Sequence, residues 1–264
     1  KDNSNQFIIG AIGAIILGIF SFTLPKCPPP KSIAKDAGFA EQMGLQAFKL
    51  FGNYKMALFF LFSMLLGAAL QLTNMYGDSF LTSFDKIEAF KDSFVVKYST
   101  IILSISQMSE TLFILTIPFF LKKFGIKKVM LFAMLAWVLR FGLFAYGDPT
   151  AMGTVHIILS CIVYGMAFDF FNISGSLFVE TSTDSSIRSS AQGLFMMMTN
   201  GVGAWLGSTV SGMVIGKYYI NADGSSNWQG IWFAFAVYAL VIAILFAVLF
   251  KHKHVPEEVA TVQH

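Results

Sequence analysis

The stretch that decides the fold is residues 230–250, which read GIWFAFAVYALVIAILFAVLF and contain no charged residue. A helix needs about 20 mostly apolar residues to cross the hydrocarbon core of a bilayer. Backbone groups in lipid must pair within their own segment, so this run predicts a transmembrane helix. Working outward, further runs of the same kind lie at residues 6–24, 57–76, 98–120, 129–146, 154–176 and 191–216. We therefore predict an all-α membrane protein with seven transmembrane helices.

The composition excludes several other classes of protein. Hydrophobic residues make up 55% of the 264 residues and charged residues only 12%, with 29 phenylalanines, which is too much apolar surface for a soluble domain to bury. The net charge of +3 is small and scattered, so nothing suggests binding of nucleic acid. Cys27 and Cys161 are too few for a disulfide framework, and no cluster of metal ligands, phosphate-binding loop or nucleophile–base pair is present. We expect no enzymatic activity, no metal and no cofactor.

The charges of the loops predict the orientation. Twelve of the 18 Lys and Arg residues fall in one set of loops, five fall in the alternate set, and Arg140 lies inside a span. Cytoplasmic loops carry the excess of Lys and Arg, so the first set is predicted to be cytoplasmic and residues 1–5 to be external. The cytoplasmic set comprises residues 25–56, 121–128, 177–190 and the tail 251–264.

One span precedes a long loop and six follow it. The loop, residues 25–56, opens with a proline-rich stretch and continues into a short amphipathic helix over residues 41–52. This layout is the one expected if a twelve-helix transporter were cut before its sixth helix. Residues 1–24 would then be the last helix of an N-terminal half, and residues 57–250 a complete C-terminal half. The chain lacks an initiator Met, so we expect it to be a piece of something longer.

Two neighbouring spans carry matching polar pairs at membrane depth. Gln71 and Asn74 lie three residues apart, as do Gln107 and Glu110, so each pair lies on one helix face. Amides both donate and accept hydrogen bonds, which suits a ligand rich in hydroxyls and ring nitrogens. The alternative is hydrogen bonding between helices, which is common for transmembrane amides. Because there are two pairs, one with a carboxyl group, we favour a binding site.

The fifth span carries an aromatic pair, Tyr164 and Phe168, at helical spacing. Such a face could stack on a flat base while the Tyr hydroxyl forms a hydrogen bond. Phe is so abundant here that chance pairing is the alternative, and the spacing alone does not decide between them.

Ionisable groups inside a membrane are costly, so each is a functional candidate. Arg140 needs a counter-ion, and either Asp169 or Glu110 could supply it. We expect a structural Arg140–Asp169 ion pair in preference to an Arg140–Glu110 pair, which would leave Glu110 to exchange protons. Glu110 and Asp169 are thus the candidate proton-coupling carboxyl groups.

Four stretches carry a resemblance to a known family. They are residues 164–176 (YGMAFDFFNISGS), residues 178–180 with 187–193 (FVE and IRSSAQG), residues 136–148 (AWVLRFGLFAYGD) and residues 250–255 (FKHKHV). Together they closely resemble the bacterial nucleoside–proton symporters of the major facilitator superfamily. The lysine-rich loop 122–128 only loosely matches the Asp-Arg-x-Gly-Arg-Arg loop of that superfamily, because the acidic residue of that motif is missing here.

The resemblance implies roles for the residues already singled out. Gln71 and Asn74 match amides that contact the nucleoside, Gln107 and Glu110 match a second polar pair, and Tyr164 and Phe168 match aromatic contacts. It implies proton-coupled nucleoside import across the inner (cytoplasmic) membrane by alternating access. The partners would be a nucleoside, a proton, the lipid bilayer and the missing N-terminal helices. The alternatives are a sugar or oligosaccharide symporter of the same superfamily and a non-transporting membrane receptor or scaffold.

Overall fold

A computed structural model describes residues 5–25, 38 and 43–253. The chain divides into two units, residues 1–42 and 43–264, and the first contains helix α1, Asn5–Ser21. Within the described residues the fold is helical, with one isolated β-bridge between Ile220 and Ser226. The elements of the second unit are η1 (Leu45–Gly52), α3 (Tyr54–Ser83), η2 (Phe84–Lys86), α4 (Phe94–Lys97), α5 (Ser99–Ile114), α6 (Ile117–Ala145), α7 (Ala151–Ser182), α8 (Arg188–Met196), η3 (Met197–Gly203), α9 (Ala204–Tyr218) and α10 (Trp228–Leu249).

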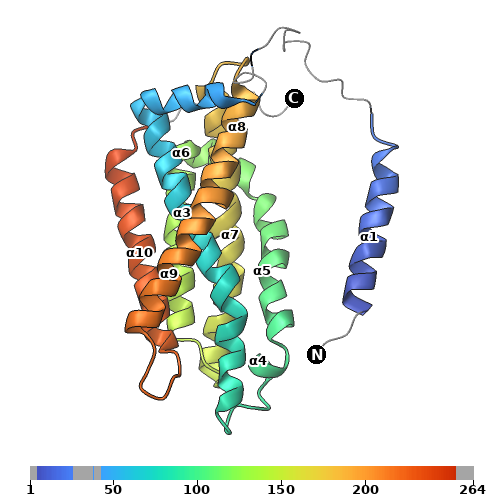
Figure 1. Cartoon of the computed structure of the whole chain (residues 1–264), viewed down its shortest axis with the longest axis vertical. Helices are drawn as coiled ribbons and strands as arrows, with labels where there is room; N and C mark the ends of the chain where they lie inside the picture. Colours follow the sequence, from blue (N-terminus) through green and yellow to red (C-terminus); the bar gives the residue numbers. More distant parts are fainter. Residues whose placement is uncertain (1–4, 26–37, 39–42, 254–264) are drawn as a thin grey trace. The chain divides into compact units, whose positions relative to one another are not determined.

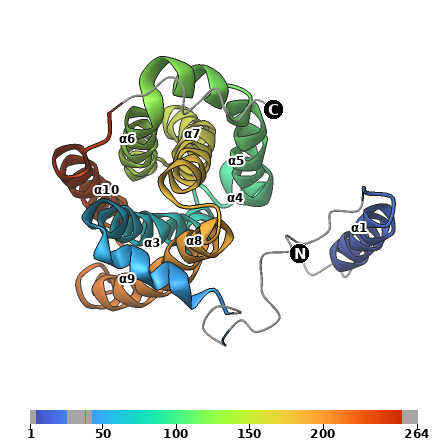
Figure 2. The ribbon, with the colours of Figure 1, turned by 90° about the horizontal axis from the view of Figure 1, so that it is seen from above.

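The second unit is a bundle in which the long helices lie alongside one another (Figures 1 and 2). Helix α7 packs between α5 and α6, and α10 packs against both α6 and α3. The segment made of α8, η3 and α9 packs on α3. The bundle interior is filled mainly by large aromatic side chains such as Trp137, Trp232 and Phe141, and Arg140 is buried among them.

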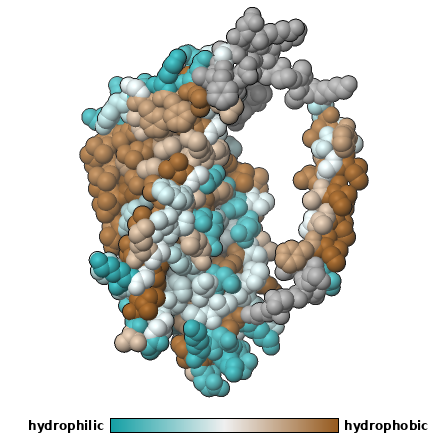
Figure 3. Space-filling model, viewed as in Figure 1, coloured by the Kyte–Doolittle hydropathy of each residue, from teal (hydrophilic) through white to brown (hydrophobic). Residues whose placement is uncertain are grey.

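Four of the described helices are long and apolar enough to cross a membrane, namely α3 with its short extension, α6, α7 and α10. The runs predicted at 57–76, 129–146, 154–176 and 230–250 fall within or closely match them. The outer surface of α10 is apolar, with Val237, Val241 and Ile244 exposed. Figure 3 shows this side of the bundle as mostly hydrophobic, whereas paler and more hydrophilic residues run down the middle of the same face.

The run predicted as one helix over residues 98–120 is interrupted. Helix α5 ends at Ile114 and α6 begins at Ile117, with Pro118 in its first turn. Proline lacks a backbone N–H and is tolerated in a first turn but not in a helix interior, which explains a new helix here. The lysine-rich loop predicted at 121–128 is also largely helical, and is broken at Gly125, whose φ of 77° is in the left-handed region that favours glycine.

The run predicted at 191–216 is likewise not a uniform α-helix. Its middle, η3 (Met197–Gly203), is a π-helical turn between α8 and α9. Here the segment lies very close to α3: a Cβ atom added to Gly67 would overlap the backbone of Thr199, and one added to Gly207 would lie 2.8 Å from the Cα of Ala68. The glycines therefore serve close helix packing, as small residues do in membrane bundles.

The long loop predicted over residues 25–56 is only partly covered by the described residues. The proline-rich stretch after residue 25 and the tail from residue 254 lie outside the described residues. Of the residues 41–52 predicted as an amphipathic helix, 41–42 lie outside the described residues and Leu45–Gly52 form the 3₁₀ helix η1, in which Ala47 is buried while Phe48 and Phe51 are exposed.

Replacement of Gly67 by Ala tests the close contact between α3 and η3. The added methyl group has no room, so we expect Gly67→Ala to lower the free energy of unfolding by about 1–3 kcal/mol. Gly212→Ala is the matched control, because nothing lies within 4 Å of a Cβ atom there and both glycines sit within helices. The measurement is the thermal unfolding midpoint in detergent. Equal midpoints for the two variants would contradict the close packing.

Candidate functional site

Four helices place polar side chains toward one region of the bundle. Arg140 on α6 is its centre, since its side chain is only 1% exposed. Its Nη1 donates to the backbone oxygen of Ser160 on α7 at 2.8 Å, and the Ser160 hydroxyl donates to the Arg140 carbonyl at 2.9 Å. Longer bonds run from the guanidinium to Thr73 Oγ1 on α3 at 3.4 Å and to Ser106 Oγ on α5 at 3.5 Å. One buried cation thus joins α3, α5, α6 and α7.

Aromatic rings enclose the same guanidinium. Its Cζ lies 4.3 Å from the centre of the Tyr164 ring and 5.0 Å from that of Phe144. A cation over a ring face is attracted by the ring quadrupole. Tyr164 is stacked on Phe168 with centroids 5.9 Å apart and planes 2° apart, and meets Trp137 edge to face at 5.7 Å. The predicted aromatic pair therefore forms one continuous face, and Arg140 fixes its position.

Glu110 faces this cluster from α5. Its side chain is half-buried, and its carboxyl group lies close enough to interact with the Tyr164 hydroxyl and with the charge of Arg140. Helices α5 and α7 approach closely here, because Ser109 Oγ donates to the backbone oxygen of Ile162 and a Cβ atom on Gly165 would overlap the Ser109 backbone. The contact positions Glu110 and Tyr164, each one residue away from it.

The predicted Arg140–Asp169 ion pair is not formed. The bonds of the guanidinium go to Thr73, Ser106 and Ser160, and Asp169 Oδ2 is buried without a hydrogen-bond partner in the described part of the chain. The reason is helix rotation: Asp169 follows Tyr164 by five residues, about 140° around the helix, and Arg140 lies over the Tyr164 face. Of the two candidate carboxyl groups, Glu110 is the one that lies close enough to interact with the charge of Arg140.

The amides lie at the edge of the cluster. Gln71 is half-buried, whereas Asn74 and Gln107 are exposed on this bundle. No hydrogen bond between the two predicted pairs is found among the described residues. Their exposure leaves these amides available to a ligand or to a further packed surface.

A small hollow adjoins the aromatic face where α3, α6, α7 and η3 meet. Asn172, which the sequence analysis does not single out as a site residue, is one of the lining residues and lies one turn beyond Phe168. The full lining is Leu66, Leu70, Trp137, Ala167, Phe168, Phe171, Asn172 and Thr199.

The sequence analysis also does not identify the hydrogen-bond partners of Arg140, among them Ser106 and Ser160. Ser160 precedes Tyr164 by four residues and Ser106 directly precedes Gln107, so helical spacing from the named residues could have found both. No group of three or more His, Cys, Asp or Glu side chains able to hold a metal occurs within residues 5–25 and 43–253.

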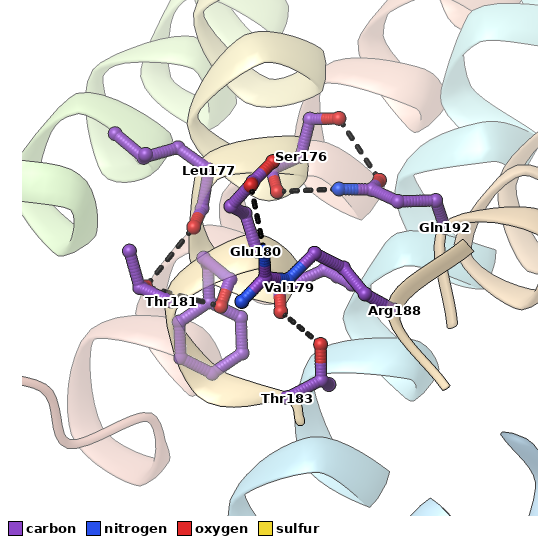
Figure 4. A network of polar contacts seen from close by, with 9 residues as sticks. Ser176, Leu177, Val179, Glu180, Thr181, Thr183, Arg188 and Gln192 are labelled. Carbon is purple, nitrogen blue, oxygen red and sulfur yellow. Dashed lines mark hydrogen bonds and ion pairs between the residues drawn. The ribbon is translucent and has the colours of Figure 1, made fainter. Parts of the chain in front are cut away.

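A second polar network fixes the connection from α7 to α8 (Figure 4). The Ser176 hydroxyl donates to Gln192 Oε1 at 2.9 Å, and Gln192 Nε2 donates back to the Ser176 carbonyl at 2.7 Å. Glu180 pairs with Arg188 at 3.2 Å, and both side chains are substantially exposed. This network joins the end of α7 to the start of α8, away from the buried cluster around Arg140.

Comparison with known proteins gives consistent results. A family model described as nucleoside H+ symporter matches residues 1–255. The chain is 56% identical to the xanthosine permease of Escherichia coli (strain K12) over 97% of this chain and 61% of the relative, and 56% identical to its nucleoside permease NupG over 98% and 62%. A crystal structure of an Asp-to-Ala mutant of the nucleoside transporter NupG superposes with a TM-score of 0.81, covering 93% of this chain and 60% of that one. The chain thus spans about three fifths of the length of these relatives.

Substitution of Arg140 tests whether its guanidinium holds the four helices together. Lysine keeps the charge but cannot reproduce the planar set of donors. We expect Arg140→Lys to lower the free energy of unfolding by about 1–3 kcal/mol, because buried partners lose their donor. Arg188→Lys is the control, since exposed ion pairs contribute about 0–1 kcal/mol. Thermal unfolding in detergent measures both, and a larger loss for Arg188→Lys would refute the assignment.

Proposed function

Because this chain belongs to the nucleoside H+ symporter family, we propose that it forms part of a transporter that imports nucleosides together with protons. The observation that carries the proposal is the cluster on α3, α5, α6 and α7, in which stacked rings and a carboxyl group lie around one buried cation and amides lie at its edge. Amides suit the hydroxyls and ring nitrogens of a nucleoside, and a flat aromatic face suits its base.

We further propose seven transmembrane segments for this chain. They are α1, α3, α5, α6, α7, the interrupted segment α8–η3–α9, and α10, with residues 57–250 as the C-terminal half of a major facilitator fold. Residues 1–24 would supply the last helix of the other half, residues 25–56 the cytoplasmic connection, and residues 251–264 a cytoplasmic tail. The exposed Asn74 and Gln107 support this arrangement, because the other half would face them and complete the site.

In this proposal the inner membrane holds the protein with its lysine-rich loops in the cytoplasm. Gln71, Asn74 and Gln107 orient the nucleoside, while Tyr164 and Phe168 stack on its base. Glu110 and Asp169 are the proton-coupling carboxyl groups. A proton on Glu110 removes the negative charge beside Arg140 and Tyr164, which changes the site that the substrate meets. Protonation of Glu110 from outside would favour closure of the loaded transporter, and release inside would follow its deprotonation, which is alternating access between two states.

Substitution of Glu110 tests the proton coupling. We expect Glu110→Gln in the full-length protein to abolish accumulation of radiolabelled nucleoside against its gradient, because the amide cannot exchange a proton. Glu180→Gln is the control, since that carboxyl group is exposed and paired with Arg188. Uptake is measured in vesicles with and without a proton gradient. Normal accumulation by Glu110→Gln would remove Glu110 from the mechanism, and inhibition by free sugars but not by nucleosides would reject the substrate class.

Removal of the Tyr164 hydroxyl tests whether this group contributes to nucleoside binding. Tyr164→Phe keeps the stacked ring but removes the hydroxyl beside Glu110, so we expect KM for nucleoside uptake to rise about two- to tenfold, as for loss of one hydrogen bond. Tyr238→Phe also removes a hydroxyl, one that donates to the Leu65 carbonyl at 2.7 Å and is not part of the cluster. An unchanged KM for Tyr164→Phe, or the same rise for Tyr238→Phe, would count against the assignment.

A further inference from the structure

A hollow of about 430 Å³ opens between the beginning of α3 and the end of α10. These two helix ends lie at the same end of the bundle, and the helices are neighbours (Figures 1 and 2). The candidate nucleoside site uses none of the residues here. The lining consists of Tyr54, Lys55, Leu58, Val248, Leu249, Phe250 and Lys251.

Two of the residues that line the hollow are positively charged. Lys55 lies in the first turn of α3 and Lys251 follows the end of α10, and among the described residues that line the hollow none is acidic. The first turn of α3 adds the positive end of its dipole. The carbonyls that end α10 oppose it, but Lys127 donates to one of them, the Ala247 oxygen, at 2.9 Å. The two lysines among the described lining residues therefore favour an anion over a cation.

The ammonium of Lys55 is held in place by its neighbours. Its Nζ lies 2.7 Å from His252 Nδ1 and 5.1 Å from the centre of the Phe178 ring. An ammonium group carries three donors and can bond to more than one acceptor at once. Lys251 is exposed and follows the end of α10, so its ammonium group can approach a ligand from the α10 side of the hollow.

The walls of the hollow continue into an apolar stripe. Val241, Ile244 and Val248 are 48%, 54% and 65% exposed, and their spacing places them on one face of α10. A soluble anion would leave this stripe uncovered. A molecule with an anionic head and a long apolar tail would cover both parts.

We propose that this hollow binds the phosphate headgroup of an anionic phospholipid, whose acyl chain lies along the exposed face of α10. The proposal rests on the membrane placement of α3 and α10 given above. Lys55 and Lys251 would donate to the phosphate oxygens. Basic pockets between transmembrane helices at the cytoplasmic side suit such headgroups, and each basic residue near the surface contributes measurably to binding.

Native mass spectrometry of the purified full-length protein tests this. Phosphatidylglycerol and phosphatidylethanolamine with the same acyl chains are added at equal concentration. We expect preferential retention of phosphatidylglycerol, a fall in its occupancy of about fivefold in Lys251→Gln, and a larger fall in the double variant with Lys55→Gln. Lys251→Arg should retain the lipid. Lys122→Gln is the matched control, because Lys122 is an exposed lysine that does not line the hollow.

Three results would overturn the proposal. They are equal retention of the two lipids by the unsubstituted protein, an equal loss in Lys122→Gln, and displacement of phosphatidylglycerol by millimolar inorganic phosphate, which would indicate a site for free anions. Lys251 lies outside the helices, so its single variant keeps the test valid if the double variant fails to fold. No transport is measured, so failure of nucleoside uptake and failure of lipid binding are distinguishable.

Discussion

A buried cation, Arg140, is the constraint on which the rest of this bundle depends. Removing a guanidinium from water costs several kcal/mol, so Arg140 has to be met by hydrogen bonds and ring faces. Its partners come from three other helices, which fixes how α3, α5 and α7 are rotated about α6. The candidate site residues then follow from chain geometry. Asn74 is next to Thr73, Gln107 is next to Ser106, and Tyr164 lies one turn from Ser160. One costly charge thus positions the groups proposed to bind the substrate.

The sequence predicts the all-α fold class because every segment that crosses a membrane must be apolar along its own length, which is a local property of the sequence. It does not predict where those helices are interrupted. Pro118 restarts a helix after a short turn, Gly125 adopts a left-handed backbone, and Met197–Gly203 forms a π-helical turn. Proline and glycine are visible in the sequence, but each is tolerated in some transmembrane helices. Whether they break a helix depends on the neighbours that satisfy the freed backbone groups, and these are set by the tertiary packing.

The candidate site also has features that the sequence predicts and features that it does not. Glu110, Tyr164, Phe168 and Arg140 could be gathered from their type and helical spacing, and the structure brings them together. The partners of Arg140 leave no charge pattern in the sequence, because the guanidinium donates to a backbone oxygen and to hydroxyl oxygens, and only helical spacing from the named residues points to Ser106 and Ser160. Counting residues along a helix gives depth and the angle between two residues of that helix, but not which of its faces is turned toward a neighbouring helix. In α7 the Tyr164 face is turned toward Arg140, so Asp169 is turned away from the guanidinium.

The bonds that fix Arg140 also give a short physical route from a proton to helix packing in the proposed cycle. Glu110 lies close enough to interact with the guanidinium of Arg140 and with the Tyr164 hydroxyl. A change in the charge of Glu110 therefore acts on the group that joins four helices. A ligand shifts an equilibrium only by its different affinity for the two states. Because the base would lie against Phe168, which is stacked with the buried tyrosine ring that covers Arg140, substrate and proton would act on connected contacts. Coupling then needs no long chain of intermediate residues.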